Sequence, residues 1–349
     1  MRIAGARGGS SVFRSTCLAG ALLWFCSAPP LGAIVTAFPT YNPNVLGSSP
    51  VDEGVDLNGV VELITSSGIG CSGSLLTDGF SILTAAHCVT NKFGGSLPTS
   101  DTAYFLGPSG TVSISVASYF VDPGYTGDST LGGDLAVLRL SQEAPAFATR
   151  YSLYAGSFTT DPILMAGYGV TGTGATGAGG GFGTLRAGTN EYVTDGSNSL
   201  FGWSASLLIG QFYDSDLPTT NALGVGLPHS PFAGLPYSAF DEVDIAPGDS
   251  GGPSFYNGQI IGVHDLAVCF GSTTCDTPPS VNPALNSYFG EMFADTSVSA
   301  NFLWIEQQEV PEPASFALIG AGLAIMGAAF RRRSRRVKDG LPHWTWLPG

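Results

Sequence analysis

Two stretches decide the fold and the chemistry of this chain: Thr84-Ala85-Ala86-His87-Cys88 and Gly248-Asp249-Ser250-Gly251-Gly252-Pro253. A serine hydroxyl is a poor nucleophile at neutral pH and needs a positioned base to accept its proton. A histidine within hydrogen-bond reach can accept that proton when a buried carboxylate fixes its tautomer. The two stretches therefore provide Ser250 as a candidate nucleophile and His87 as its candidate base.

A third stretch provides the carboxylate. Asp134 opens the apolar run Leu135-Ala136-Val137-Leu138, a pattern typical of a buried strand. The three candidates occur in the order His87, Asp134, Ser250, separated by 47 and 116 residues. Catalytic groups that are far apart in sequence and close together in the fold are typical of a nucleophile–base–carboxylate triad.

At these residues the chain closely resembles the trypsin-like (chymotrypsin-fold, peptidase family S1) serine endopeptidases. The resemblance implies an all-β fold of two antiparallel six-stranded β-barrels packed face to face, with His87 and Asp134 in the first and Ser250 in the second. It also implies hydrolysis of protein or peptide substrates through an acyl-enzyme intermediate, without metal or cofactor. In that scheme the backbone N–H groups of Gly248 and Ser250 form the oxyanion hole.

The strand pattern alone supports a β-sandwich or barrel, because short β-rich runs recur with turn residues between them. The glycine-rich segment Gly167–Gly183 is predicted to be a flexible surface loop. A final helix is predicted over Val298–Gln307, with Phe302, Trp304 and Ile305 packed on the body, as in the family. The predicted strands are Gly59–Ile64, Ser81–Thr84, Thr111–Val116, Asp134–Leu140, Ile163–Ala166 and Gln259–Val263.

The charge distribution excludes nucleic-acid binding by the main body. Residues 34–330 contain four basic residues against 26 acids, a net charge of about −22, whereas phosphate contacts need lysine and arginine. Such acidity is typical of a solvated surface that keeps an exported protein soluble. Attraction of cationic substrates is the alternative interpretation.

Four cysteines remain once the first 33 residues are set aside, and an even number in an exported chain favours disulfides. The resemblance implies that Cys71 pairs with Cys88 and clamps the loop that carries His87. Cys269 and Cys275 are predicted to form the second bridge. A zinc site is the alternative for cysteine and histidine at close spacing, but the chain has no Cys-x-x-Cys pair to support one.

The N-terminus has the features of a secretory signal peptide, residues 1–33, with a basic region followed by a short apolar stretch. Cleavage after Ala33 would leave Ile34 as the mature N-terminus, and cleavage after Ala37 would leave Phe38. The resemblance implies that an ammonium group on Ile34 pairs with Asp249 and shapes the oxyanion hole. The protease domain is predicted to span residues 34–309.

The C-terminal end resembles the PEP-CTERM sorting signal of Gram-negative bacteria over residues 310–336, with Pro311, Glu312 and Pro313 ahead of an apolar run and an arginine cluster. The run at 314–330 is predicted to be a single transmembrane helix of about 26 Å, barely enough for a bilayer core of ~30 Å. The expected partners are a signal peptidase and an exosortase-type sorting enzyme. The protein is expected at the periplasmic side of the inner membrane or, after sorting, at the outer surface; residues 337–349 have no predicted role.

Substrate choice leaves two interpretations open. Asp244 lies six residues before Ser250, where trypsin-like enzymes carry the acid that binds arginine or lysine. The alternative is that Asp244 is a surface acid beside Asp241 and Glu242. The loop Ile245-Ala246-Pro247 also resembles that of HtrA-type proteases, which prefer apolar residues. His264 is predicted to line or cap the cleft.

The alternatives for the whole protein are an HtrA-like quality-control protease and a catalytically silent protease-fold protein that binds partners at the cell surface. The intact triad residues argue against the silent protein. HtrA-type proteases normally add a peptide-binding domain, and the ~50 residues between Val263 and Val310 leave no room for one.

Overall fold

The computed structural model describes residues 34–36, 51–90 (except 53, 67 and 69), 100–197 (except 175), 202–212, 242–268, 287–309 (except 289) and Met326. Several predictions lie outside these residues and are not tested by them. They concern the signal peptide, a start at Phe38, the Cys269–Cys275 bridge, Pro311–Pro313, the helix at 314–330 and the tail at 337–349. Among the described residues, no helix has the length and apolar character needed to span a bilayer.

The first half is a closed antiparallel barrel in which β4 pairs with β5 and β7, and β9 pairs with β6 and β8. Side chains alternate along β7, where Ala103 and Phe105 point into the core and their neighbours do not. The prediction of a six-stranded first barrel is therefore confirmed. Its strands, in barrel order, are β4 (Val60–Thr65), β5 (Gly70–Leu75), β6 (Ser81–Thr84), β9 (Ala136–Leu140), β8 (Gly110–Val121) and β7 (Asp101–Gly107).

The second half differs from the predicted closed six-stranded barrel. Its described residues form a seven-stranded antiparallel sheet whose two edge strands, β13 and β14, are not hydrogen-bonded to each other. Only Glu191 separates these edges along the chain, so the sheet curls round and its ends meet covalently at that residue. In sheet order the strands are β13 (Arg186–Asn190), β10 (Ile163–Gly167), β17 (Pro253–Tyr256), β18 (Gln259–Val268), β19 (Met292–Ser297), β15 (Leu207–Gln211) and β14 (Tyr192–Asp195).

Local sequence explains the β17–β18 hairpin. Asn257 and Gly258 connect the strands with φ values of 51° and 76°, the left-handed conformation that a tight hairpin turn requires and that asparagine and glycine adopt most readily. The predicted strand starting at Gln259 begins where expected and continues to Val268.

The glycine-rich segment is more ordered than predicted. Tyr168 is buried, and β11 (Thr171–Thr173) pairs with β12 (Gly177–Ala178) in a four-stranded sheet. A side chain at Gly172 would lie 2.0 Å from the carbonyl oxygen of Gly177, so glycine permits the close approach of the two strands. The prediction of a flexible surface loop is wrong for this part of the segment, because its glycines serve strand packing.

The same small sheet holds the predicted mature N-terminus. β1 (Ile34–Thr36) lies between β11, to which it is parallel, and β16 (Val243–Asp244), to which it is antiparallel. Two short strands, β2 (Val51–Asp52) and β3 (Val55–Asp56), form a separate pair. This arrangement brings Ile34 next to the segment that leads to Ser250.

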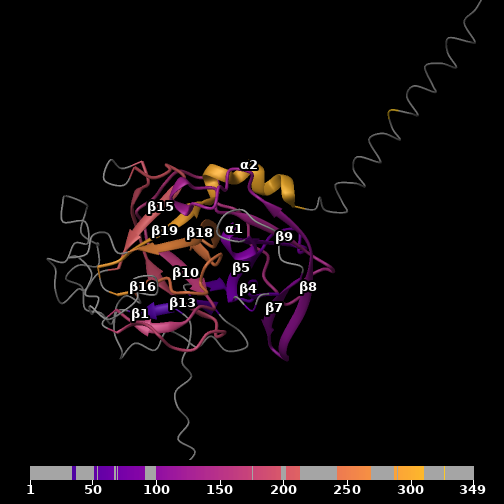
Figure 1. The fold of residues 1–349 in the computed structure, drawn as a ribbon. Helices are drawn as coiled ribbons and strands as arrows, with labels where there is room; N and C mark the ends of the chain where they lie inside the picture. Colours follow the sequence, from indigo (N-terminus) through magenta and orange to yellow (C-terminus); the bar gives the residue numbers. More distant parts are fainter. Residues whose placement is uncertain are drawn as a thin grey trace, which may run out of the picture.

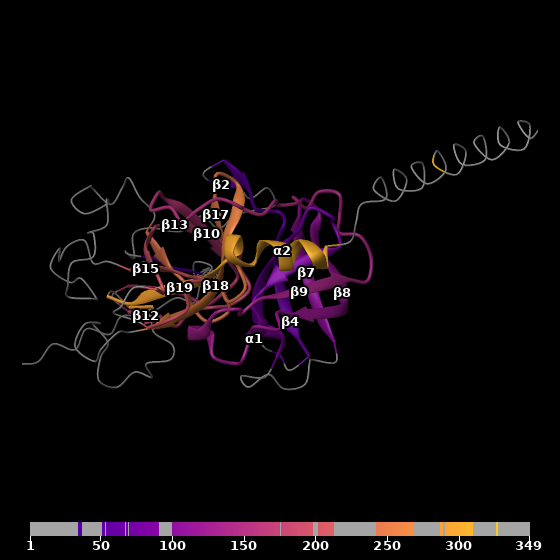
Figure 2. The ribbon, with the colours of Figure 1, turned by 90° about the horizontal axis from the view of Figure 1, so that it is seen from above.

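The final helix, α2 (Val298–Gln308), confirms the predicted helix to within one residue and lies across the two halves (Figures 1 and 2). The Ser297 side chain caps its start by accepting a hydrogen bond from the N–H of Ala300. Ile305 is fully buried, and Phe302 and Trp304 pack against the core. Its end contacts the first barrel, where Arg139 donates to the carbonyl of Gln308 and Thr77 donates to Glu309.

The Cys71–Cys88 disulfide of the first barrel should stabilise the fold mainly by restricting the unfolded chain. For a loop of 17 residues, the loop-closure model gives about 3 kcal/mol. We expect the Cys71→Ala/Cys88→Ala double variant to lose about that much free energy of unfolding in a denaturant titration. A double variant that keeps the wild-type stability and the wild-type resistance to thermolysin would contradict the prediction. Added reductant serves as the control for the remaining thiols.

Candidate active site

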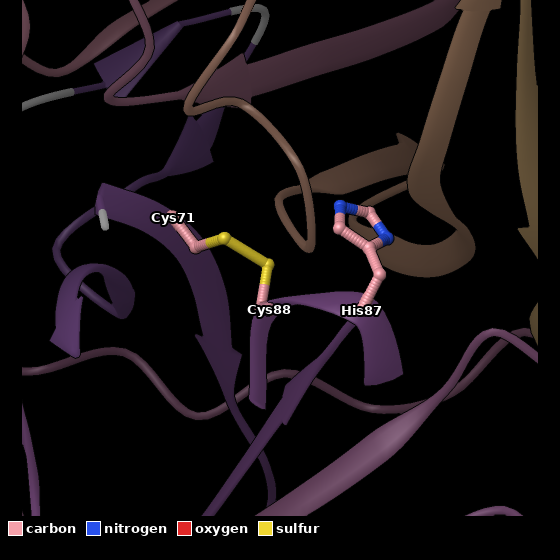
Figure 3. Close-up of side chains that lie close together, drawn as sticks. All are labelled: Cys71, His87 and Cys88. Carbon is pink, nitrogen blue, oxygen red and sulfur yellow. A yellow bond between two sulfur atoms is a disulfide. The ribbon is translucent and has the colours of Figure 1, made fainter. Parts of the chain in front are cut away.

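His87 lies on α1 (Ala86–Val89), a single turn that follows β6. The neighbouring Cys88 is bonded to Cys71 on β5, and the disulfide runs beside the imidazole ring (Figure 3). Because the bond ties α1 to the adjacent strand, the position of His87 relative to the barrel is fixed covalently. The ring remains 26% exposed, which leaves it open to a substrate.

Asp134 lies just before β9 and is fully buried beside His87. One carboxylate oxygen accepts the backbone N–H of His87 at 2.8 Å, and the other lies 2.6 Å from His87 Nδ1. The Ser129 hydroxyl donates to the second oxygen at 2.8 Å. Burial raises the pKa of Asp134, but the charge and hydrogen bonds of its neighbours outweigh burial and lower the pKa to about 2. The Asp134 carboxylate is therefore ionised at neutral pH.

The loop that carries Ser250 packs directly against the strand and helix that hold His87. The Ser250 carbonyl accepts the backbone N–H of Ser72 at 2.9 Å, and the Cys88 sulfur lies 3.5 Å from the same oxygen. Ser72 follows Cys71 on β5, so both ends of the disulfide lie close to the serine loop. The structure thus brings Ser250 and His87 to one place between the two halves.

Gly251 permits this close packing. Its φ is +80°, and a Cβ there would lie 2.0 Å from the Thr84 hydroxyl and 2.5 Å from the Ser72 carbonyl oxygen. No other residue type combines that backbone conformation with that space. The glycine after the serine is therefore required by the contact between the two halves.

The backbone N–H groups of the loop alternate between paired and unpaired. Asp249 N–H donates to the carbonyl of Ala246, and Gly251 N–H donates to that of His264. Within the described part of the chain, no hydrogen bond uses the N–H of Gly248 or Ser250. Gly248 has a φ of +101°, and its carbonyl accepts the Ser72 hydroxyl at 2.9 Å. This geometry leaves two neighbouring donors available to an external acceptor.

Asp249 is fully buried behind the loop and is held by backbone donors. Its two oxygens accept the N–H groups of Gly169 at 2.8 Å and Ala246 at 2.9 Å, and the N–H of Ile34 also donates to it. Burial raises the pKa of Asp249 to about 6, against the effect of these bonds and of the His264 charge. Ile34 is itself fully buried, so the structure places the predicted mature N-terminus at the predicted carboxylate.

Asp244 is not a surface acid, because none of its area is exposed. Its Oδ1 accepts the N–H of Ile245 at 2.8 Å, and its Oδ2 has no hydrogen-bond partner among the described residues. Burial and the nearby acids, Glu291 first among them, raise the pKa of Asp244 well above its ordinary value. The surface-acid interpretation is therefore wrong, and the carboxyl lies in surroundings that favour its protonated form.

The prediction that His264 lines or caps the cleft is wrong, because this residue is fully buried. Its Nδ1 lies 3.0 Å from Asp295 Oδ1, and the other Asp295 oxygen accepts the hydroxyls of Tyr192 and Ser254, each at 2.5 Å. Sequence reasoning missed this second histidine–aspartate pair. The available signal was an acid directly after the apolar run Met292-Phe293-Ala294.

The donor groups near the site do not fit a metal ion. Cys71 and Cys88 are joined to each other, so neither offers the thiolate that zinc needs. Asp265, which sequence reasoning also missed, clusters with His87 and Asp134. The last two are already joined by a direct hydrogen bond of 2.6 Å, closer than two ligand atoms of one metal ion would lie.

Comparison with known proteins gave two family matches. Residues 50–198 match the family model described as Trypsin, a range that includes His87 and Asp134 and ends before Ser250. Residues 309–333 match the PEP-CTERM protein-sorting motif. Similar curated proteins include Trypsin delta and Trypsin gamma of Drosophila erecta, each 29% identical over 209 residues, and Trypsin beta of the same species, 27% identical over 210. Each alignment covers 58% of this chain and 70% of the relative.

The packing of Gly251 gives a sharp test of the site geometry. We expect Gly251→Ala to destabilise the fold by at least about 2 kcal/mol more than Gly258→Ala and to lower the activity of the folded fraction about 100-fold. Gly258 is the matched control, since its φ is +76° and a Cβ there meets nothing within 4 Å. Denaturant titration and initial rates measure the two effects. Equal behaviour of the two variants would show that the contact with Thr84 and Ser72 is unimportant.

Proposed function

We propose that this chain is an exported serine endopeptidase acting through His87, Asp134 and Ser250, a proposal supported by its matches to the Trypsin family model and to the PEP-CTERM sorting motif. The single observation that carries the proposal is the buried Asp134 carboxylate, which accepts both the backbone N–H and the Nδ1 of His87. That pair fixes the tautomer in which Nε2 can accept the proton of a serine hydroxyl.

In the proposed reaction, the Ser250 hydroxyl attacks the carbonyl carbon of a substrate peptide bond while His87 Nε2 accepts its proton. His87 then donates this proton to the leaving amine, which departs and leaves an acyl group on Ser250. A water molecule, deprotonated by His87, hydrolyses the acyl-enzyme and restores the serine. Asp134 stabilises the imidazolium in both steps and stays ionised throughout.

The unpaired N–H groups of Gly248 and Ser250 support an oxyanion hole at this loop. Charge develops on the substrate oxygen in the transition state, and preorganised donors there need no rearrangement. Loss of one such donor in comparable sites costs ~3–4 kcal/mol of transition-state stabilisation. The φ of +101° at Gly248 supports this proposal, because glycine adopts that backbone conformation without strain.

The contact between Ile34 and Asp249 supports activation by cleavage after Ala33. Ile34 has a φ of +65°, a conformation that strains a β-branched residue against the preceding carbonyl. Cleavage before Ile34 removes that carbonyl and creates an ammonium group next to a buried carboxylate. A start at Phe38 would instead delete the residue that contacts Asp249.

Asp244 extends the proposal to substrate choice. Its unpaired Oδ2 lies among acids, so an arginine or lysine side chain reaching it would supply a missing positive charge. The neighbouring Ile245 and Ala246 would favour an apolar side chain instead. The ratio of kcat/KM for arginine and leucine substrates, compared between the wild type and Asp244→Asn, separates the two interpretations.

The PEP-CTERM motif supports sorting by an exosortase-type enzyme, with the new C-terminus near Pro311–Pro313. The physical reason is that a helix of seventeen residues is marginal as a permanent anchor but can hold a protein in the membrane until cleavage. The mature enzyme would then work at the outer surface. A retained helix would keep it at the inner membrane.

The nucleophile can be tested directly. We expect Ser250→Ala to fold normally and to lose at least about 10⁴-fold in kcat, because its loss removes the covalent step. A fluorophosphonate probe should label the wild type and not the variant. A wild type that resists the probe would instead indicate a catalytically silent protein that binds partners.

The N-terminus gives a second test. We expect protein starting at Ile34 to have a kcat/KM at least about 10-fold higher than protein that retains Gly32-Ala33. This ratio corresponds to the free energy of about one charge-assisted hydrogen bond. Asp249→Asn should abolish this difference, because it removes the partner of the ammonium. Mass spectrometry defines both ends before the assay. Equal activity of the two forms would disprove the proposed activation.

A further inference from the structure

Asp265 projects from an irregular point in β18. The pairing of β18 with β19 shifts between His264 and Leu266, so Asp265 is the extra residue of a β-bulge. A bulge re-aims side chains, and here two consecutive residues, His264 and Asp265, are both buried. His264 contacts Asp295 within its own half, whereas Asp265 reaches the carboxylate of Asp134 in the other half.

The surroundings of Asp265 contain one donor and one unusual neighbour. Its Oδ2 accepts the Thr296 hydroxyl at 2.9 Å, while its Oδ1 is buried and accepts no donor among the described residues. One ligand atom each of His87, Asp134 and Asp265 lies within 4.8 Å of the other two, so the two buried carboxyl groups are direct neighbours. Asp265 itself is only 5% exposed, so its carboxyl is withdrawn from bulk solvent.

Two carboxyl groups can share a hydrogen bond only if one of them holds a proton. Asp134 already accepts two donors from His87 and one from Ser129, all of which favour its ionised form. Asp265 accepts the Thr296 hydroxyl and lies near that of Ser129, and its Oδ1 accepts no donor among the described residues. The proton therefore belongs to Asp265.

We propose that Asp265 is a positioning residue of the catalytic site, which stays a neutral carboxylic acid and donates its proton in a hydrogen bond to the Asp134 carboxylate. This inference rests on the proposed serine endopeptidase function. Asp265 touches neither substrate nor reacting atoms; it acts through Asp134, which in turn orients His87. The bond adds a fourth donor to a buried carboxylate that has no cation beside it other than the imidazolium.

The groups that face Asp265 from the packed elements agree with this protonation state. They are Asp134 before β9, Ser129 on η1 (Ser129–Leu131), Tyr125 and Thr296 on β19, with His87 beyond Asp134. None of them is a permanent cation. Burial first, and then the charge of Asp134, raises the pKa of Asp265 well above its ordinary value.

The test compares Asp265→Asn with Asp265→Leu. Asparagine keeps a donor for Asp134 and an acceptor for Thr296, so kcat should stay within about threefold of the wild type. Leucine fills similar space without a donor, and kcat should fall about 10- to 100-fold with KM unchanged. The acid limb of the kcat/KM profile should keep its midpoint in Asp265→Asn, because a neutral side chain replaces a neutral one. Asp128→Asn, an exposed acid nearby, is the charge control.

An infrared difference spectrum between the wild type and Asp265→Asn provides a readout that does not depend on activity. The wild type should show the carbonyl band of a neutral buried carboxylic acid, and the variant should lack it. Absence of that band, an acid limb that moves to lower pH by about one unit or more in Asp265→Asn, or wild-type kcat in Asp265→Leu would each overturn the proposal. A wild type that carries the band but resists the fluorophosphonate probe would disprove the proposed function alone.

Discussion

The whole site depends on how Ser72 joins the two halves of the molecule. Its backbone N–H donates to the Ser250 carbonyl, its hydroxyl donates to the Gly248 carbonyl, and the same hydroxyl accepts the N–H of Tyr168, each at 2.9 Å. Its own carbonyl accepts the Thr84 hydroxyl at 2.8 Å. One small residue on β5 therefore contacts the loop that carries Ser250, the segment at Tyr168 and the strand that leads to His87.

The disulfide makes this junction rigid on the histidine side. Cys71 precedes Ser72, and Cys88 follows His87, so the bond fixes the base relative to the residue that holds the nucleophile loop. A catalytic pair that is held by direct backbone contacts tolerates little change, because a displacement of about 1 Å can cost 100-fold in rate. The requirement for glycine at position 251 follows from the same contact.

The interior contains many acids and almost no lysine or arginine to pair with them. Five buried carboxyls illustrate how the described interior accommodates them: Asp134 contacts His87, Asp295 contacts His264 and two hydroxyls, Asp249 accepts backbone N–H groups, and burial raises the pKa values of Asp244 and Asp265. Ionising a buried carboxyl without such a partner is strongly unfavourable. The acidity of the chain thus extends from its surface into the site.

Sequence reasoning succeeded where a local pattern determines the structure. The apolar run after Asp134 and the strand at Ser81–Thr84 were found because an apolar run is a local signal, and the final helix was found from its apolar residues and the family resemblance. Sequence reasoning failed for the glycine-rich segment, because Gly172 packs against Gly177 where β11 pairs with β12. Amino-acid composition does not reveal such a strand pairing. Sequence reasoning missed Asp265 because a β-bulge is decided by the partner strand, so the face on which this residue lies could not be predicted.

Asp249 shows how little the fold must change on activation. In the uncut chain its pKa is about 6 against an ordinary 3.8, so this group lowers stability as pH rises through that range, by about 3 kcal/mol in all. Above pH 6 the carboxylate is ionised, and the groups that contact it directly are the N–H dipoles of Gly169, Ala246 and Ile34. An ammonium group on Ile34 would reverse the sign of this contribution, because it supplies a full charge to an oxygen that already accepts the Ile34 N–H. Cleavage would then stabilise a loop that is already built, rather than build it.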